Sequence, residues 1–327
     1  MGVKLRWFSL ITLFVLATVL PGCTWEVAQP ETEKKQESYR YPLTGIEGEK
    51  GEQPILMVMV NNQQQARPQT GLDRADLVVE MLAEGEITRF AAFYHSQQEG
   101  IVGPVRSLRP YYLNLAKGLK AISVHAGGST EAMDMIQQEK LPSLDGIHEG
   151  AKYFWRVDFR PAPHNLYTRM DLLLDGVEEA GWEQKKVEVP FRFAKEGATV
   201  EGKEALEIQI MYNPLYKLSY QYDPNSQIYT RYTQGEPHID NETKQPLTMQ
   251  NVLVIKAPHQ IVDQAGRRRI ELDGTGEGYL FQHGKGISIR WKNEQGVLLP
   301  IADGKVLPLV PGKTWVNVIP DSADVTY

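Results

Sequence analysis

The sequence predicts a mixed α/β protein, with an N-terminal α/β domain over residues 42–182 and a smaller, mainly β domain over residues 183–327. In the first part, short continuous apolar runs alternate with segments of helical periodicity, which is the pattern of a sheet covered by helices. In the second part, apolar and polar residues alternate in short runs between turn residues, which indicates strands joined by hairpins. The chain of 327 residues is long enough for two domains that each bury a core.

Residues 1–22 have the features of an export signal. Lys4 and Arg6 precede an apolar run from Trp7 to Leu20, which is shorter than the ~20 residues that a helix needs to span a bilayer. The run leads into Leu20-Pro21-Gly22-Cys23, which resembles the lipobox of bacterial lipoproteins. The resemblance implies cleavage before Cys23 and attachment of diacylglycerol, with acyl chains such as palmitate, to its sulfur. Such a lipid anchor would hold the protein at the extracytoplasmic face of the cell membrane. The alternative is an ordinary secretory signal with a chance cysteine.

Composition and charge exclude several kinds of site. The formal net charge of -6 argues against general nucleic-acid binding, because proteins that track phosphates normally carry a basic excess, although local basic patches stay open. Cys23 is the only cysteine, so the rest of the chain has no disulfide, cysteine nucleophile or zinc-thiolate site. Residues 23–41 are polar and charged, and we expect them to form a disordered tether.

The elements of the N-terminal part follow from its periodicity. Four apolar runs are predicted to be strands, at 54–60, 75–80, 88–94 and 121–124. Helical spacing predicts helices at 110–119, from Thr130 onward, and at 170–180. The segment 142–168 has no regular pattern, and we predict a long irregular connection of the kind that often carries function.

The C-terminal part reads as strands and turns. Alternation at 216–222 and 228–233, around the turn at 223–226, predicts a hairpin. Further short strands are expected at 251–256, 278–282, 286–291 and 314–319. The basic triplet at 267–269 is interpreted as a solvated loop.

The stretch from Gly103 to Ser129 is the predicted functional site. It combines arginines, hydroxyl groups, a histidine and a glycine pair where a strand passes into a helix, and this combination is typical of anion binding. Arginine forks bind phosphates and carboxylates bidentately, so we expect the arginines of this half to converge on one anion, with Glu80 and Glu84 orienting them. The predicted ligand-binding residues are Arg89, Arg106, Ser107, Arg109, Gly127, Gly128, Ser129, Arg156, Arg160 and Asn165. The alternative is that these arginines and glutamates pair with each other and hold the long connection in place.

His125 and His164 are the candidates for proton transfer, with Glu80 and Glu84 as further catalytic candidates. No spacing typical of a metal site accompanies the two histidines, so we predict neither a metal nor another cofactor. A histidine at a strand end can also be a hydrogen-bonded structural residue, and Ser129 fits a helix N-cap before it fits a nucleophile. The aromatic residues of the long connection, Phe154, Trp155 and Tyr167, could stack on sugar rings or pin the connection to the core.

Five motifs together resemble the YerB family of bacterial lipoproteins, which carry a domain of unknown function, numbered 3048, in two parts. The resemblance covers nearly all of the chain after the signal, and Glu86 stands where the family usually has a glycine. The resemblance implies a lipid-anchored protein but does not imply any particular activity. The motifs are Ala66-Arg67-Pro68-Gln69, Ile87-Thr88-Arg89-Phe90, Gly103-Pro104-Val105-Arg106-Ser107, His125-Ala126-Gly127-Gly128-Ser129 and Pro163-His164-Asn165-Leu166-Tyr167.

The order of elements around Arg106 and the glycine pair is also similar, more remotely, to the LytR-CpsA-Psr family. That similarity implies arginines on a pyrophosphate and transfer of lipid-linked cell-wall polymers. Ser107 departs from it, because that family has an aspartate after its arginine.

Three functions follow from these observations. The first is a binding or accessory protein for an anionic component of the cell envelope, lipid-linked or polymeric. The second is an enzyme of envelope phosphodiester or glycan chemistry that uses His125 or His164 as an acid or base. The third is a structural partner of another envelope protein.

Overall fold

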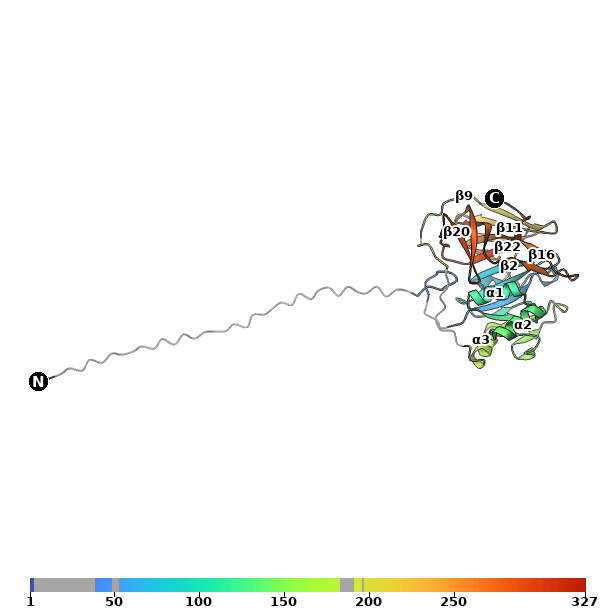
Figure 1. Cartoon of the computed structure of the whole chain (residues 1–327), viewed down its shortest axis with the longest axis horizontal. Helices are drawn as coiled ribbons and strands as arrows, with labels where there is room; N and C mark the ends of the chain where they lie inside the picture. Colours follow the sequence, from blue (N-terminus) through green and yellow to red (C-terminus); the bar gives the residue numbers. More distant parts are fainter. Residues whose placement is uncertain (3–38, 49–52, 183–190, 196) are drawn as a thin grey trace. The chain divides into compact units, whose positions relative to one another are not determined.

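Continuous apolar runs of the first half form the middle of a large β-sheet. The computed structural model describes residues 1–2, 39–48, 53–182, 191–195 and 197–327, and the architecture below belongs to the unit Ser38–Tyr327 (Figure 1). Almost every residue of four strands is buried, because layers cover both faces of the sheet. These strands are β1 (Leu56–Asn61), β2 (Leu77–Glu84), β3 (Ile87–Tyr94) and β5 (Ile122–His125).

Strands from both halves of the chain share this sheet. Over the described residues it has twelve strands, in the order β21-β20-β19-β18-β15-β22-β2-β3-β1-β5-β6, with β9 beside β19. The strand β22 (Thr314–Pro320) lies between β15 (Asn251–Ala257) and β2 and is parallel to both. The other members are β6 (Ser143–Asp145), β9 (Lys203–Glu204), β18 (Thr275–Gln282), β19 (Lys285–Glu294), β20 (Val297–Ala302) and β21 (Lys305–Val306).

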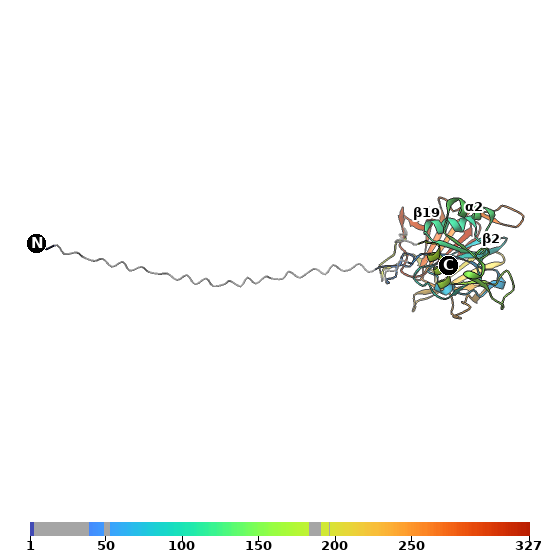
Figure 2. The same ribbon diagram turned by 90° about the horizontal axis from the view of Figure 1, so that it is seen from below.

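Two helices cover one face of the large sheet. They are α1 (Pro110–Gly118), which begins with a proline, and α2 (Thr130–Glu139), whose N-cap Ser129 accepts a hydrogen bond from the Ala132 amide. Both helices lie along one side of the sheet in the two views (Figures 1 and 2). The buried tyrosines Tyr111 and Tyr112 of α1 donate hydrogen bonds to carbonyl groups at the ends of β2 and β3.

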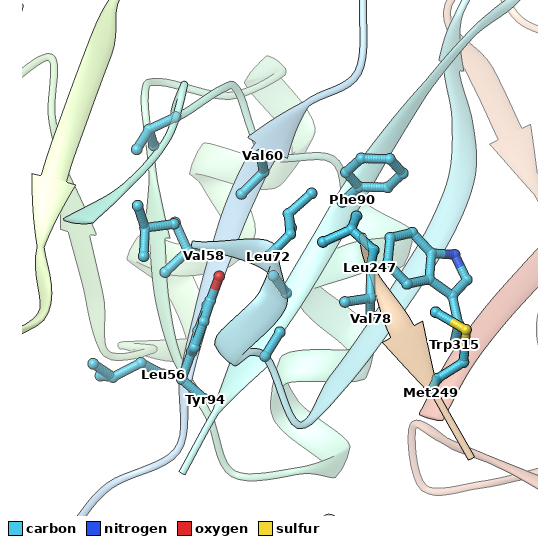
Figure 3. Packing of buried hydrophobic residues seen from close by; sticks show 14 of the residues in the cluster. Leu56, Val58, Val60, Leu72, Val78, Phe90, Tyr94, Leu247, Met249 and Trp315 are labelled. Atoms are coloured by element: carbon cyan, nitrogen blue, oxygen red, sulfur yellow. The ribbon is translucent and has the colours of Figure 1, made fainter. Parts of the chain in front are cut away.

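A second sheet packs on the opposite face. Over the described residues it has six strands, in the order β13-β12-β11-β10-β23 with β14 beside β12. Figure 3 shows how Leu247 and Met249 of this layer pack near Val78, Phe90 and Trp315 of the large sheet. The strands are β10 (Glu207–Asn213), β11 (Tyr216–Asp223), β12 (Ile228–Thr233), β13 (Glu236–Pro237), β14 (Thr248–Met249) and β23 (Asp324–Thr326).

Small elements complete the fold beside this core. The strands β4 (Ile101–Val102), β8 (Leu166–Arg169) and β7 (Phe154–Arg156) form a three-stranded sheet, and α3 (Met170–Glu179) follows β8 directly. The strands β16 (His259–Ile261) and β17 (Arg268–Ile270) form a separate hairpin. Three short 3-10 helices are η1 (Gln64–Ala66), η2 (Leu72–Arg74) and η3 (Gly150–Lys152).

The predicted fold class is confirmed, as a mixed α/β protein with a mainly β C-terminal part. The prediction of an irregular connection at 142–168 was wrong, because β6, β7 and the start of β8 lie within it as strands too short to show a period. The basic triplet is not simply a solvated loop, since Arg268 lies in β17 and is half-buried. The division at 182/183 stays a prediction. Cys23, nearly all of the signal at 1–22 and nearly all of the tether lie outside the described residues.

Candidate anion-binding site

The candidate site lies at the edge of the large sheet where β1 ends. Since β1 and β5 are parallel, their carboxyl ends meet at this edge. The segment after Gly103 crosses the edge and is fixed by backbone hydrogen bonds, from Val105 to the Leu166 carbonyl (2.7 Å) and from Arg106 to the Met59 carbonyl (2.8 Å). The predicted stretch therefore does run along the end of the sheet, next to β1, β5 and β8.

Arg89 and Arg109 are brought together, and an acidic side chain pairs with both. Glu84, at the end of β2, accepts a hydrogen bond from Arg89 at 2.7 Å and forms an ion pair with Arg109 through its other oxygen. Arg89 also donates to the main-chain carbonyl of Ser107 at 2.6 Å, so Ser107 takes part through its backbone. This arrangement matches the alternative that the arginines and glutamates pair with each other.

Arg106 and Arg160 differ, because no carboxylate in the described part of the chain lies within ion-pair distance of either. Arg106 makes one long hydrogen bond, 3.4 Å, to the Gln63 side chain. Arg160 is 8% exposed and donates to the carbonyls of Gln65 (3.2 Å) and Pro68. The Nε atom of each arginine is buried and has no hydrogen-bond partner among the described residues.

His164 lies with these two arginines. Its Nδ1 atom is 2.7 Å from the Asn61 side-chain nitrogen, at the end of β1, and its residue is 9% exposed. Burial, followed by the positive charges of Arg106 and Arg160, lowers the pKa of His164. The ring is therefore neutral at pH 7 and accepts a hydrogen bond from Asn61, which leaves its Nε2 atom as a donor.

Arg156 and Asn165 lie on the neighbouring strands β7 and the approach to β8. Arg156 is exposed and donates to the Asn165 side chain at 2.8 Å, and Asn165 donates weakly to the Val157 carbonyl at 3.3 Å. The two residues thus pair with each other.

His125 and the glycine pair are held by internal contacts. The His125 ring is fully buried between the Gly127 carbonyl (2.9 Å) and the Ser143 hydroxyl (2.6 Å), and burial lowers its pKa. The Gly127 amide donates to the Asp145 carboxylate at 2.7 Å. Gly127 has a φ of 64°, in the left-handed region that favours glycine, and Gly128 pairs with Leu108. The Asp145 carboxylate therefore already accepts the hydrogen bond that the Gly127 amide would otherwise donate to a bound anion.

Glu80 lies on the other face of the sheet, away from Glu84. It is fully buried and forms an ion pair of 2.8 Å with Arg231 of β12, which is also fully buried. Arg231 was not among the predicted site residues. The alternation of β12 could have identified it, because Tyr229, Arg231 and Thr233 all point inward.

The aromatic residues of the connection are mostly structural. Phe154 and Tyr167 are each 1% exposed, so neither presents a face to a sugar ring. Phe159, which we did not single out, is 63% exposed and lies 5.5 Å below the Arg160 guanidinium and 5.9 Å from the Tyr167 ring.

The described residues contain neither a cluster of metal ligands nor a helix that could span a membrane. No group of three or more histidine, cysteine, aspartate or glutamate side chains is placed to hold a metal ion in the described ranges. Within the same ranges, no helix has both the length and the apolar character needed to cross a membrane.

Comparison with known proteins gives matches along almost the whole chain. The family models for the N-terminal and C-terminal domains of "Protein of unknown function (DUF3048)" match residues 43–183 and 208–316. A protein of Bacillus subtilis (strain 168), named "Putative lipoprotein YerB", is 40% identical over 321 residues, which cover 97% of this chain and 96% of the relative. The crystal structure of the YerB protein from Bacillus subtilis superposes with a TM-score of 0.82, covering 88% of this chain and 100% of that chain.

Proposed function

The chain belongs to the DUF3048 family, and from that premise we propose that it is a lipoprotein anchored through Cys23 that binds an anionic component of the cell envelope. The proposed anion site consists of Arg106, Arg160 and His164, with the Asn61 and Gln63 side chains beside them. The name of the relative supports the lipid anchor and the extracytoplasmic location.

The observation that carries the proposal is the pair of arginines without an acidic partner. A guanidinium group that is removed from water and left unpaired costs free energy, and proteins normally pair such groups. Arg109, three positions after Arg106 in the chain, and Arg89 do have such a partner in Glu84. A phosphate or carboxylate at Arg106 and Arg160 would supply the missing negative charge.

The position of the anchor limits where the ligand can be. About 16 residues separate Cys23 from Tyr39, where the described structure resumes. Such a segment spans at most ~55 Å when fully extended. The site would therefore work close to the membrane surface, which fits a lipid-linked or polymeric envelope anion.

The test is a thermal-shift screen of the full chain in detergent against inorganic phosphate, teichoic-acid fragments, polyprenyl phosphates and muropeptides. A ligand that binds only the native state raises stability, by about 2.7 kcal/mol at a hundred times its Kd. We expect a shift with a phosphate-bearing ligand that is lost in Arg106→Gln and in Arg160→Gln.

The matched control is Arg156→Gln, which removes a nearby exposed arginine and should keep the shift. A folded protein that responds to none of these ligands would refute the proposal. A shift that survives in the Arg106→Gln/Arg160→Gln double variant would refute this location. Chemical turnover of a bound ligand would instead favour the enzyme alternative.

A further inference from the structure

A second pocket of about 530 Å³ is lined by the loop after β1, the start of β3 and the second sheet. Its volume falls in the range of small-molecule sites, ~300–1,000 Å³. None of Arg106, Arg160 and His164 lines it. The residues that line it include Asn62, Gln64, Gln65, Arg67, Tyr216 and Gln234.

The floor of this pocket is held in one arrangement by a buried hydrogen-bond network. The Asn62 side-chain amide donates to the Thr88 hydroxyl at 2.7 Å and to the Tyr216 hydroxyl at 2.6 Å. Thr88 and Tyr216 each donate to one oxygen of Glu80 at 2.7 Å, and Arg231 holds the other oxygen. Because these buried hydrogen bonds hold Asn62, Thr88 and Tyr216 in place, the floor of the pocket is preorganised for a ligand.

Arg67 brings a positive charge to the pocket. Its Nε and Nη2 atoms donate to Asn62 at 3.0 and 2.9 Å, and its guanidinium lies 5.2 Å over the Tyr216 ring. Its Nη1 atom makes no hydrogen bond within the described structure, and no carboxylate there lies within ion-pair distance of it. The acidic residue on the rim, Glu86, is engaged by Arg268 at 3.0 Å.

The rim of the pocket consists largely of amides. Gln64 and Gln65 are exposed, and their side chains make no hydrogen bonds to the part of the chain that the structure describes. Gln234 also lines the pocket, and its side chain donates to the Leu215 carbonyl and accepts a long hydrogen bond, 3.4 Å, from the Lys217 amide. Side-chain amides offer a donor and an acceptor side by side, which matches hydroxyl groups, since these both donate and accept.

We propose that this pocket is a second binding site, for an acidic sugar whose carboxylate or phosphate contacts Arg67 and whose hydroxyl groups contact the glutamine rim. Arg67 has no acidic partner in the described structure, so its charge favours a ligand with an acid group. The side-chain amides of the rim favour a ligand that also carries hydroxyl groups. Gln63 lines this pocket and also accepts a hydrogen bond from Arg106, but none of Arg106, Arg160 and His164 lines it, so the two proposals can fail separately.

The experiment is calorimetric titration of the full chain in a polyoxyethylene detergent, which carries no sugar headgroup. The ligands are D-glucuronate, N-acetylmuramic acid and glucose 6-phosphate, with glucose and N-acetylglucosamine as neutral counterparts. We expect at least one acidic sugar to bind about tenfold more tightly than its neutral counterpart. The comparison of glucuronate with glucose 6-phosphate then identifies the acid group. Equal affinity for acidic and neutral sugars, or no binding of any of them at millimolar concentration, would overturn the proposal.

Variants test the location. Gln64→Glu places a negative charge on the rim at a side chain without structural hydrogen bonds, so it should fold normally and weaken acidic-sugar binding about tenfold. Gln137→Glu makes the same change on an exposed position of α2, on the opposite face of the sheet, and should have no effect. Arg67→Gln should abolish binding, and Arg106→Gln should preserve it. If Gln64→Glu binds acidic sugars as tightly as Gln137→Glu does, the pocket is not the site.

Discussion

At the scale of single residues, the arginines of the protein differ in whether a carboxylate neutralises their charge. Arg231 is fully enclosed by Glu80, Tyr216 and the rings of Phe90 and Trp315, the latter at 4.7 Å from the guanidinium. Arg106 and Arg160 lack such a partner, and that difference separates a structural ion pair from a candidate binding site.

Removing one partner of the Glu80–Arg231 ion pair should strongly destabilise the protein. Glu80→Gln leaves the buried guanidinium uncompensated, and we expect a loss of about 3–5 kcal/mol in the free energy of unfolding, measured by urea denaturation. Arg231→Met should cost a similar amount, and the double variant less than the sum. Glu47→Gln removes one partner of the exposed pair with Arg40 and should change stability by less than about 1 kcal/mol. Additive losses would show that the two charges are not coupled.

At the scale of elements, the β16–β17 hairpin holds the turn that carries Glu84. The Gly85 amide donates to the Gly266 carbonyl at 2.9 Å, and Arg268 donates to the Gly85 carbonyl at 2.7 Å. A hairpin from the second half of the chain thereby fixes the carboxylate that pairs with Arg89 and Arg109.

Arg268→Ala should therefore loosen this turn. We expect a loss of about 1–3 kcal/mol in the free energy of unfolding, since a hydrogen-bonded cation with a side chain only 10% exposed is removed. Hydrogen exchange at the Gly85 amide should become faster. Arg269→Ala, at the exposed next position, is the control and should stay within about 0.5 kcal/mol. Equal effects of the two substitutions would mean that the hairpin does not hold the turn.

The elements also show which parts of the fold could be predicted from the sequence. Strands such as β3, with its apolar run, and β12, with its alternation, were predictable because these patterns are local, and so were the helices α1 and α3. The position of β22 between β15 and β2 was not, because it depends on pairing between residues more than 200 positions apart. For the same reason, all five arginines of the predicted site could be named, but not which of them Glu84 would neutralise.

At the scale of the whole molecule, buried histidines make stability depend on pH. His95, His125, His164 and His238 are each at most 9% exposed, and burial is the main cause that lowers the pKa of each. The pKa of His238 lies well below its ordinary value, because the Arg231 charge acts in the same direction as burial. The native state therefore keeps these rings neutral at pH values where the unfolded chain binds protons.

The free energy of unfolding should consequently fall as the pH drops below about 6.5, the unfolded pKa of histidine. In that window the unfolded state binds more protons than the native state, and each fully shifted histidine adds a slope of about 1.4 kcal/mol per pH unit. Urea denaturation between pH 8 and pH 5 measures the slope, and His238→Asn should reduce it by about that amount. The His238 ring followed by NMR should remain neutral down to pH 5. A free energy of unfolding that stays constant or increases as the pH drops from 8 to 5 would contradict the burial of these rings, because protonation would then not oppose folding.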